Sequence, residues 1–244
     1  MARLDLSGKA AVVTGASKGI GYAIAQSIAA GGADVMICSR SREEIEEAAA
    51  RLDAADGGTV VGVPCDMRNA QDVERLIGAA VERFGRLDIL INNAGVGGFA
   101  PVDQISLDTW HQVIETNLNG VFYACHAAIP HLREGGGGWI INIGSLAGKN
   151  PFAGGAAYNA SKFGLLGFSE AMMLDVRHDG IRVSCIMPGS VETHFSGTGS
   201  QRSDGSDWKL QSDDIAEMVI DLLSFHSRAL PSRVEMRPSR PPRK

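Results

Sequence analysis

Thr14-Gly15-Ala16-Ser17-Lys18-Gly19-Ile20-Gly21 follows a short apolar run at Ala10–Thr14 and opens a stretch rich in Ala and Ile at Ile20–Ala30. The pattern predicts a strand, a glycine turn and a helix. Glycine suits such a turn because it adopts positive φ and lets a ligand approach the backbone. The free N–H groups of the helix start would favour a phosphate. Glycines alone could simply make a tight turn, but their place after the first strand is typical of dinucleotide-binding folds.

The rest of the chain alternates apolar runs with amphipathic stretches. Further strands are predicted at Ala33–Cys38, Thr59–Cys65, Leu87–Ile91, Trp139–Ile143 and Ile181–Ile186. Further helices are predicted at Arg42–Leu52, Ala70–Phe84, Leu107–Leu132 and Tyr158–His178. Continuous apolar strands that alternate with helices indicate a parallel sheet covered on both faces. We therefore expect one doubly wound, Rossmann-type α/β domain over residues 1–244, with a sheet of about seven strands.

Two segments depart from this pattern. Ser196–Trp208 is polar and rich in Gly and Ser, which predicts a mobile loop within a substrate loop at about residues 190–211. The basic, proline-rich tail at residues 237–244 predicts an extended or frayed end, although a docking motif is the alternative.

Composition limits the class of protein. The chain has 244 residues, 44% of them hydrophobic, so it can bury a sizeable core as a single domain. Its net charge of −5 argues against binding to nucleic acid or to anionic membranes. The four cysteines lie far apart, without a CxxC pair, which favours reduced thiols over a disulfide framework or a zinc site. We find no signal peptide or membrane span in the sequence and expect a cytoplasmic protein without a metal.

Several short motifs and single polar residues follow the glycine turn along the sequence. They are Asn92-Asn93-Ala94-Gly95, Asn117, Ser145, Tyr158-x-x-x-Lys162, Pro188-Gly189 and Val191-x-Thr193. Together with the Gly-x-x-x-Gly-x-Gly spacing, this set resembles the short-chain dehydrogenase/reductase family from residue 5 to about residue 225. The pattern is most similar to the 3-oxoacyl-(acyl carrier protein) reductase branch. The end of the chain departs from that branch, because residues 229–238 replace its GxxxxVDGG-like segment; a last strand is still predicted at Arg233–Arg237.

The residues after the second strand predict the cofactor. NAD-preferring sites place a carboxylate there, whereas this chain has Arg40, and Lys18 in the glycine turn adds a second positive charge. Both could meet a 2′-phosphate, which predicts NADP(H); the alternative is that both are solvated surface charges. By resemblance, Asp66 binds the adenine and Thr193 the nicotinamide carboxamide, although Asp66 could instead be a helix N-cap. The predicted cofactor-binding residues are Gly15, Ser17, Lys18, Gly19, Ile20, Gly21, Ser39, Arg40, Asp66, Met67, Asn93, Ala94, Gly95, Tyr158, Lys162, Pro188, Gly189, Val191 and Thr193.

Ser145, Tyr158, Lys162 and Asn117 are the predicted catalytic residues. Tyr158 and Lys162 share a helix face one turn apart, so the Lys162 ammonium and an oxidised nicotinamide should lower the phenol pKa from its usual value near 10. The resemblance implies that Tyr158 exchanges a proton with the substrate oxygen and that Lys162 holds the nicotinamide ribose. It implies that Ser145 donates to the carbonyl oxygen and that Asn117 positions a water. Taken singly, each could be an ordinary helix or loop residue, and Asn92 and Asn93 could serve strand-end backbone groups.

The resemblance implies an NADP(H)-dependent oxidoreductase that reduces a ketone or aldehyde, such as a 3-oxoacyl thioester. A non-catalytic NADP(H) sensor, a general carbonyl reductase or alcohol dehydrogenase, an isomerase or dehydratase, and a scaffold remain alternatives. Specificity should come from Gly95–Ala100, Leu146–Phe152 and the segment after Pro188, around a fairly open pocket that His194 could line.

The predicted partners are a small carbonyl or alcohol substrate and further copies of the chain, in a dimer or tetramer formed through the two long helices. Arg133 and Arg177 could meet an acyl carrier protein, but ordinary surface charges are the alternative.

Overall fold

One parallel sheet organises the protein, a computed structural model that describes residues 4–53, 55, 57–193 and 207–242. In these residues seven strands lie in the order β3-β2-β1-β4-β5-β6-β7, and every neighbouring pair is parallel. Their bounds are β1 Ala10–Thr14, β2 Asp34–Ser39, β3 Val60–Pro64, β4 Ile89–Asn92, β5 Gly138–Ile143, β6 Ile181–Pro188 and β7 Arg233–Met236. The strand order reverses between β1 and β4, which creates a crevice at the carboxyl ends of the strands. The predicted doubly wound fold is confirmed.

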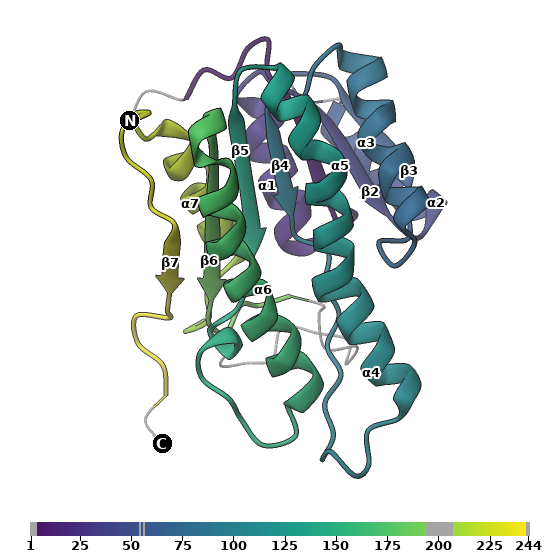
Figure 1. Ribbon diagram of the computed structural model, residues 1–244, viewed down its shortest axis with the longest axis vertical. Coiled ribbons are helices and arrows are strands. Elements are labelled where there is room, and N and C mark those ends of the chain that lie inside the picture. The colour runs from purple at the N-terminus through teal and green to yellow at the C-terminus, as the bar shows by residue number, and fades with distance from the viewer. Residues whose placement is uncertain (1–3, 54, 56, 194–206, 243–244) are drawn as a thin grey trace.

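Helices cover both faces of the sheet (Figure 1). α1 (Gly19–Ala30), α2 (Arg42–Asp53) and α7 (Ser212–Ser224) pack on one face. α3 (Ala70–Phe84), α5 (Gly120–Glu134) and α6 (Ala156–Val176) pack on the other. The strands read as continuous apolar runs because each is buried from both sides. None of the helices in the described ranges is both long and apolar enough for a membrane span.

Local signals explain where α3 begins and ends. The side chain of Asn69 accepts hydrogen bonds from the backbone N–H groups of Gln71 and Asp72, and Gly85 closes the helix at φ +76°. Asp66 is therefore not the N-cap of this helix.

The predicted helix Leu107–Leu132 is helical throughout, but it is not α-helical throughout. α4 (Leu107–Ile114) and α5 are joined by a π-helical turn, η1, at Glu115–Asn119. The turn carries Asn117 inward, where its side-chain amide forms hydrogen bonds with the backbone N–H (2.8 Å) and C=O (2.9 Å) of Val96. A tertiary contact thus interrupts a regular helical pattern at a polar residue.

The C-terminal elements complete the sheet. α7 was not predicted; it starts with a capping box between Gln211 and Asp214 and buries Ile215, Val219 and Leu222 against α1 and the sheet. The strand predicted at Arg233–Arg237 is present as β7 and pairs with β6.

Candidate active site

The carboxyl ends of four strands meet at one edge of the sheet, the lower end in Figure 1. The glycine turn follows β1, Asn93 follows β4, Ser145 follows β5, and Pro188 ends β6. Parallel strands bring their carboxyl ends to the same edge, so residues far apart in sequence share one crevice.

The glycine turn is packed against the segment after β4. Gly15 and Gly19 have φ angles of +65° and +62°, which favour glycine. A Cβ on Gly15 would lie 2.7 Å from Cα of Ala94, and one on Gly21 would lie 2.4 Å from Nδ2 of Asn93. The Asn93 amide donates to the carbonyl oxygens of Thr14 and Gly15, each at 2.9 Å. Asn93 therefore fixes the turn through its backbone, as one of the sequence alternatives stated.

The start of α1 fits a dinucleotide pyrophosphate. Its N-cap, Lys18, makes no side-chain hydrogen bond to the first turn, and that turn contains no acidic residue. The first N–H groups of α1 therefore receive no acceptor from the N-cap side chain, and helix starts of this kind can bind an anion. Thr193 reaches the same place, since its Cγ2 lies 3.8 Å from where a Cβ on Gly19 would stand.

The two basic residues predicted to recognise NADP differ in their surroundings. Arg40 follows β2 and is exposed. Lys18 forms an ion pair with Glu44 of α2 at 3.5 Å, and Glu44 also accepts from Ser17 Oγ at 3.4 Å. Sequence reasoning missed Glu44, because nothing in an amphipathic helix shows which of its carboxylates faces the glycine turn.

The residue predicted to bind the adenine already has a hydrogen-bond partner. Asp66 receives a bidentate contact from Arg68 at 2.5–3.0 Å, which lowers the pKa of the carboxyl, and Arg40 lowers it further. Met67 is buried, and its carbonyl oxygen packs against Gly120.

The last predicted cofactor segments lie at the end of β2 and beyond β6. Ser39 Oγ donates to the Ser41 carbonyl, Gly189 N–H donates to Met236, and Val191 bridges to Leu210. His194, Phe195 and the polar residues up to 206 lie outside the described residues.

Ser145, Tyr158 and Lys162 are brought together beside Gly95. Ser145 forms a hydrogen bond with Tyr158 and caps the short turn η2 (Leu146–Gly148). The Lys162 ammonium lies 5.8 Å from the centre of the Tyr158 ring and 3.8 Å from where a Cβ on Gly95 would stand. Gly95 thus leaves room for the lysine, and the predicted triad forms one cluster.

Lys162 is buried, with only 5% of its surface exposed, and its Nζ donates to the carbonyl oxygen of Ile143 at 2.9 Å. Burial lowers the pKa of Lys162 to about 8. A lysine poised near neutrality can hold or release a proton, unlike one in water.

The expected lowering of the Tyr158 pKa is not found. Burial raises the pKa of Tyr158 above its usual value, and the hydrogen bond from Ser145 only partly opposes this. The ammonium of Lys162 donates to the Ile143 carbonyl, and it is not among the causes that shift the pKa of Tyr158. In the protein without a cofactor, Tyr158 is therefore held in its neutral form.

Asn117 lies behind the triad, fully buried. Besides its two bonds to Val96, its Nδ2 donates to Ser161 Oγ at 3.1 Å, and Ser161 donates to the carbonyl oxygen of Tyr158 at 2.8 Å. Asn117 therefore braces the backbone that carries Tyr158. That it positions a water remains a prediction.

Two aromatic rings flank the triad. Phe99, on the loop after β4, contacts the Tyr158 ring edge-on with 5.5 Å between ring centres. Phe152 lies 5.9 Å from Phe99 in the loop before α6. Sequence analysis placed both in specificity segments but did not single out Phe99; an aromatic residue a few positions past Asn-Asn-Ala-Gly was the available signal.

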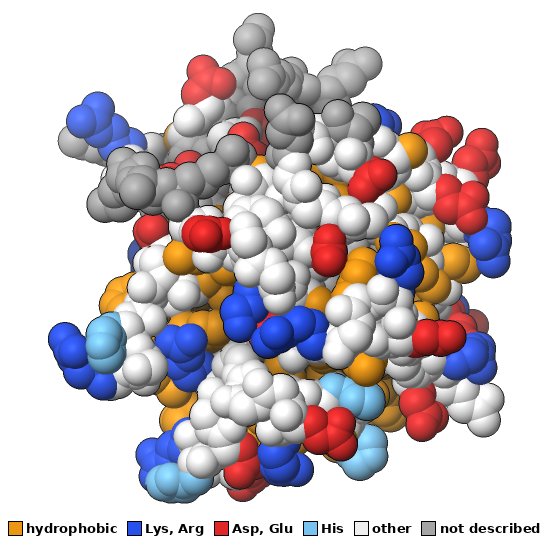
Figure 2. Space-filling model, turned by 90° about the horizontal axis from the view of Figure 1, so that it is seen from above, with side chains coloured by type: hydrophobic (Ala, Val, Ile, Leu, Met, Phe, Trp, Pro, Cys, Tyr) orange, Lys and Arg blue, Asp and Glu red, His pale blue; other side chains and the backbone are white. Residues whose placement is uncertain are grey.

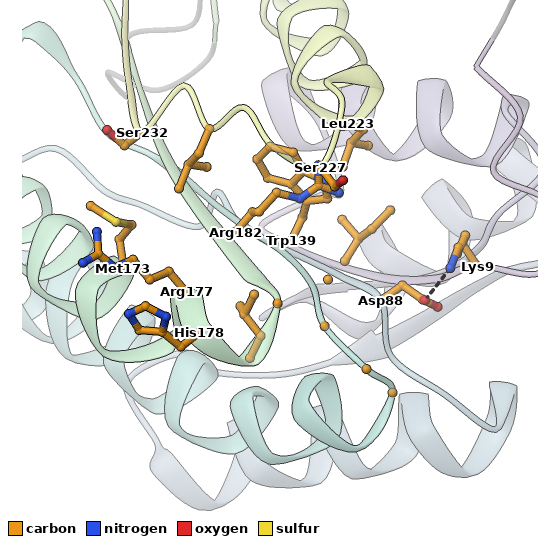
Figure 3. A pocket seen from close by; sticks show the side chains of 18 of the residues that line it. Lys9, Asp88, Trp139, Met173, Arg177, His178, Arg182, Leu223, Ser227 and Ser232 are labelled. Atoms are coloured by element: carbon orange, nitrogen blue, oxygen red, sulfur yellow. Dashed lines mark hydrogen bonds and ion pairs between the residues drawn. The ribbon is translucent and has the colours of Figure 1, made fainter.

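A separate hollow of about 940 Å³ lies at the opposite edge, where the strands begin (Figure 3). Figure 2 looks onto this end, where Lys and Arg side chains gather near the middle of the face. Arg177 and Arg182 both line the hollow, and none of the predicted catalytic or cofactor residues lines it. Arg133, the other arginine considered for binding a carrier protein, forms an ion pair with Asp179 at 2.7 Å, so its charge already has a partner.

Comparisons with known proteins agree with this arrangement. A family model described as short chain dehydrogenase matches residues 9–204. Dehydrogenase/reductase SDR family member 4 of Oryctolagus cuniculus is 36% identical over 195 residues, which cover 80% of this chain and 75% of that protein. A Streptomyces coelicolor protein with a provisional name as a ketoacyl reductase is 35% identical over 92% of this chain and 86% of its own. A metagenomic short-chain oxidoreductase solved in complex with NADP is 35% identical, with a TM-score of 0.84 over 97% of this chain and 99% of that one.

Proposed function

This chain belongs to the short-chain dehydrogenase/reductase family of oxidoreductases, and from that premise we propose that it is an NADP(H)-dependent enzyme that reduces a ketone or aldehyde to an alcohol. The observation that carries the proposal is the convergence of Ser145, Tyr158 and buried Lys162 at the carboxyl edge of the sheet, the same edge at which the glycine turn opens α1. A sensor would need the nucleotide site but not this cluster.

The neutral state of Tyr158 suits it to act as the acid of the reduction step. Because burial keeps its phenol protonated, Tyr158 has the proton that a carbonyl oxygen must receive when it becomes an alcohol. Bound NADPH would supply the hydride. Ser145 donates a hydrogen bond to the same oxygen and stabilises the negative charge that develops there. Lys162, with a pKa of about 8, holds a positive charge near Tyr158 at neutral pH, although its Nζ donates to the Ile143 carbonyl and not to the phenol.

The preference for NADP(H) over NAD(H) rests on charge. Arg40 is exposed beside the end of β2, where the ribose 2′ position of a nucleotide at the glycine turn would lie. Lys18 can join it once its exposed ion pair with Glu44 opens. The NADP found in the metagenomic relative supports this assignment.

The reaction test follows NADPH consumption with an acetoacetyl thioester, a 1,2-diketone and an aromatic aldehyde, with NADH as the control. Turnover of at least one carbonyl with NADPH, and much less with NADH, is expected. Turnover confined to the thioester would support the ketoacyl reductase branch, as the name of the Streptomyces relative suggests. NADPH binding without turnover of any carbonyl would overturn the proposal in favour of a sensor.

We also propose a homo-oligomer. Phe122 on α5 and Phe163 on α6 are 48% and 45% exposed, which is costly for aromatic side chains in water. Gel filtration at micromolar concentration tests this, and a monomer would contradict it.

A further inference from the structure

Three aromatic rings stand in a row beside the reacting group. Phe152 contacts Phe99 at a tilt of 47°, and Phe99 contacts Tyr158 edge-to-face at 68°. Such geometries are the preferred ones for aromatic pairs. The row therefore begins at the proposed proton donor and extends away from it as an apolar surface.

Backbone contacts fix the two phenylalanines in place. The N–H of Ala100 donates to the carbonyl oxygen of Gly154 at 2.9 Å, so the two loops that carry the rings are tied together. The N–H of Phe152 donates to Oδ1 of Asn159, and a Cβ on Gly155 would lie 2.6 Å from the Phe152 ring. Gly155 thus provides the space that the ring occupies. The surface is formed before any substrate binds, which lowers the entropic cost of binding.

Both rings remain open to solvent. Phe99 is 50% exposed and Phe152 is 47% exposed. Exposed apolar surface of this kind is unfavourable in water and commonly marks a ligand-binding groove. Because Phe99 contacts the ring of Tyr158, it borders the space in which a group that accepts a proton from Tyr158 would bind.

We propose that Phe99 and Phe152 form the wall of the substrate pocket and select carbonyl substrates that carry an uncharged aryl group. The inference rests on the proposed reductase function and names its substrate class. A carbonyl oxygen within hydrogen-bonding distance of the Tyr158 hydroxyl places one substituent of the carbonyl carbon within reach of Phe99. A flat aromatic substituent gains edge or offset contacts there. An anionic substituent would meet the negative faces of the rings, so the selected group is uncharged.

The test compares acetophenone with 2-butanone, which share a methyl ketone but differ in the aryl group. With saturating NADPH, the wild-type kcat/KM for acetophenone should exceed that for 2-butanone. Phe99→Ala should lower kcat/KM for acetophenone about tenfold, equivalent to ~1.4 kcal/mol, while 2-butanone changes less than about twofold. Phe152→Ala should show the same selectivity with a smaller effect, because Phe152 lies farther along the row.

Phe225→Ala is the matched control. Phe225 is 44% exposed and follows α7, near the opposite edge of the sheet, so its truncation should change neither substrate. Equal losses for both ketones in Phe99→Ala would show that Phe99 supports Tyr158 rather than the substrate, and would overturn the inference. Unchanged kinetics with acetophenone would overturn it as well.

A binding measurement separates this inference from the proposed function. Saturation-transfer NMR of acetophenone with the NADPH-bound protein requires no turnover. If the protein reduces no ketone but Phe99→Ala weakens this signal, the result would support aryl binding by Phe99 and contradict only the proposed reductase function. Absence of that signal, or a signal that Phe99→Ala leaves intact, would refute the proposed binding of an aryl group by these rings, even if the enzyme is active.

Discussion

The ammonium of Lys162 donates to the carbonyl oxygen of Ile143 at 2.9 Å, and no described carboxylate pairs with it. The bond joins the start of α6 to the end of β5 and thereby places the lysine beside Tyr158. A buried cation held by one carbonyl dipole is poorly solvated, which explains why the pKa of Lys162 falls to about 8. The site thus keeps a destabilising group for its chemistry.

Lys162→Met should therefore stabilise the protein while it abolishes turnover. In the window between pH 8 and the unfolded value near 10.5, the unfolded state binds more protons at this residue, so wild-type stability rises with pH there. Below that window the buried charge of Lys162 lowers the free energy of unfolding by roughly 3 kcal/mol. Lys162→Met removes this cost, but it also removes the hydrogen bond to Ile143, which stabilises the wild type by about 1 kcal/mol. Urea denaturation at pH 7 should show a gain of about 2 kcal/mol. The gain should vanish above pH 10.5; a loss of stability at pH 7 would contradict the account.

Tyr158→Phe tests the acid role. The substitution removes only the hydroxyl, so the ring contact with Phe99 remains. Single-turnover rates should fall about a thousandfold, because the carbonyl oxygen loses its proton donor. NADPH binding, measured by cofactor fluorescence, should be unchanged. Tyr123→Phe on α5 is the control; similar losses in both variants would point to a folding defect instead.

Asp88→Asn probes the opposite edge of the sheet. Asp88 is buried and accepts hydrogen bonds from Lys9, from Arg86 and from the backbone N–H of Ala10. Burial alone would raise its pKa, but these donors outweigh burial and lower it. The substitution should cost about 3 kcal/mol at pH 7, because two cations lose their partner.

This contribution of Asp88 should be present above the unfolded pKa near 3.9 and lost as the pH falls through the lower folded value. Urea midpoints at pH 7 and pH 3 measure it, with the exposed Asp103→Asn as the control. Rates per folded molecule should stay unchanged, because the residue lies far from Tyr158.

Local rules were enough to predict the sheet, the glycine turn and the shared helix face of Tyr158 and Lys162, whereas Ser145 joined them only through the resemblance to the family. Gly15 and Gly19 adopt the positive φ angles that their turn implied, and the strands were readable because burial on both faces makes them continuously apolar. The four-residue spacing of Tyr158 and Lys162 fixed their common helix face. These features depend on neighbours in sequence, so one sequence reveals them.

Features set by tertiary contacts could not be predicted. The π-helical turn at Glu115–Asn119 exists because Asn117 reaches Val96, and no helical periodicity encodes that contact. The raised pKa of Tyr158 depends on burial, which only the folded chain provides. Glu44 faces Lys18 because α2 packs beside the glycine turn.

Arg40→Asp should reverse the charge at the proposed 2′-phosphate contact. A lost charge-assisted hydrogen bond is worth about 1.5–3 kcal/mol, so NADPH should bind on the order of 10- to 100-fold more weakly. NADH lacks the phosphate and should change little. Fluorescence titrations with both cofactors decide the matter, with Arg228→Asp beyond α7 as the control. Equal weakening for NADPH and NADH would refute phosphate recognition by Arg40.

Glu44→Gln should tighten NADPH binding. In the wild type, the carboxylate of Glu44 lies 3.5 Å from the Lys18 ammonium and also accepts from Ser17, so it competes with a phosphate for both. Exposed ion pairs are worth little, and the expected gain is therefore about threefold in Kd at low salt.

Because exposed charges are screened, the gain from Glu44→Gln should shrink toward nothing near 1 M salt, whereas a packing effect would persist. Glu46→Gln, on the same helix and paired with Arg42, removes an equal charge away from Lys18 and should change Kd less. If both variants tighten binding equally, the gain reflects net charge alone; if Glu44→Gln weakens binding, the carboxylate orders the glycine turn rather than competing with the cofactor.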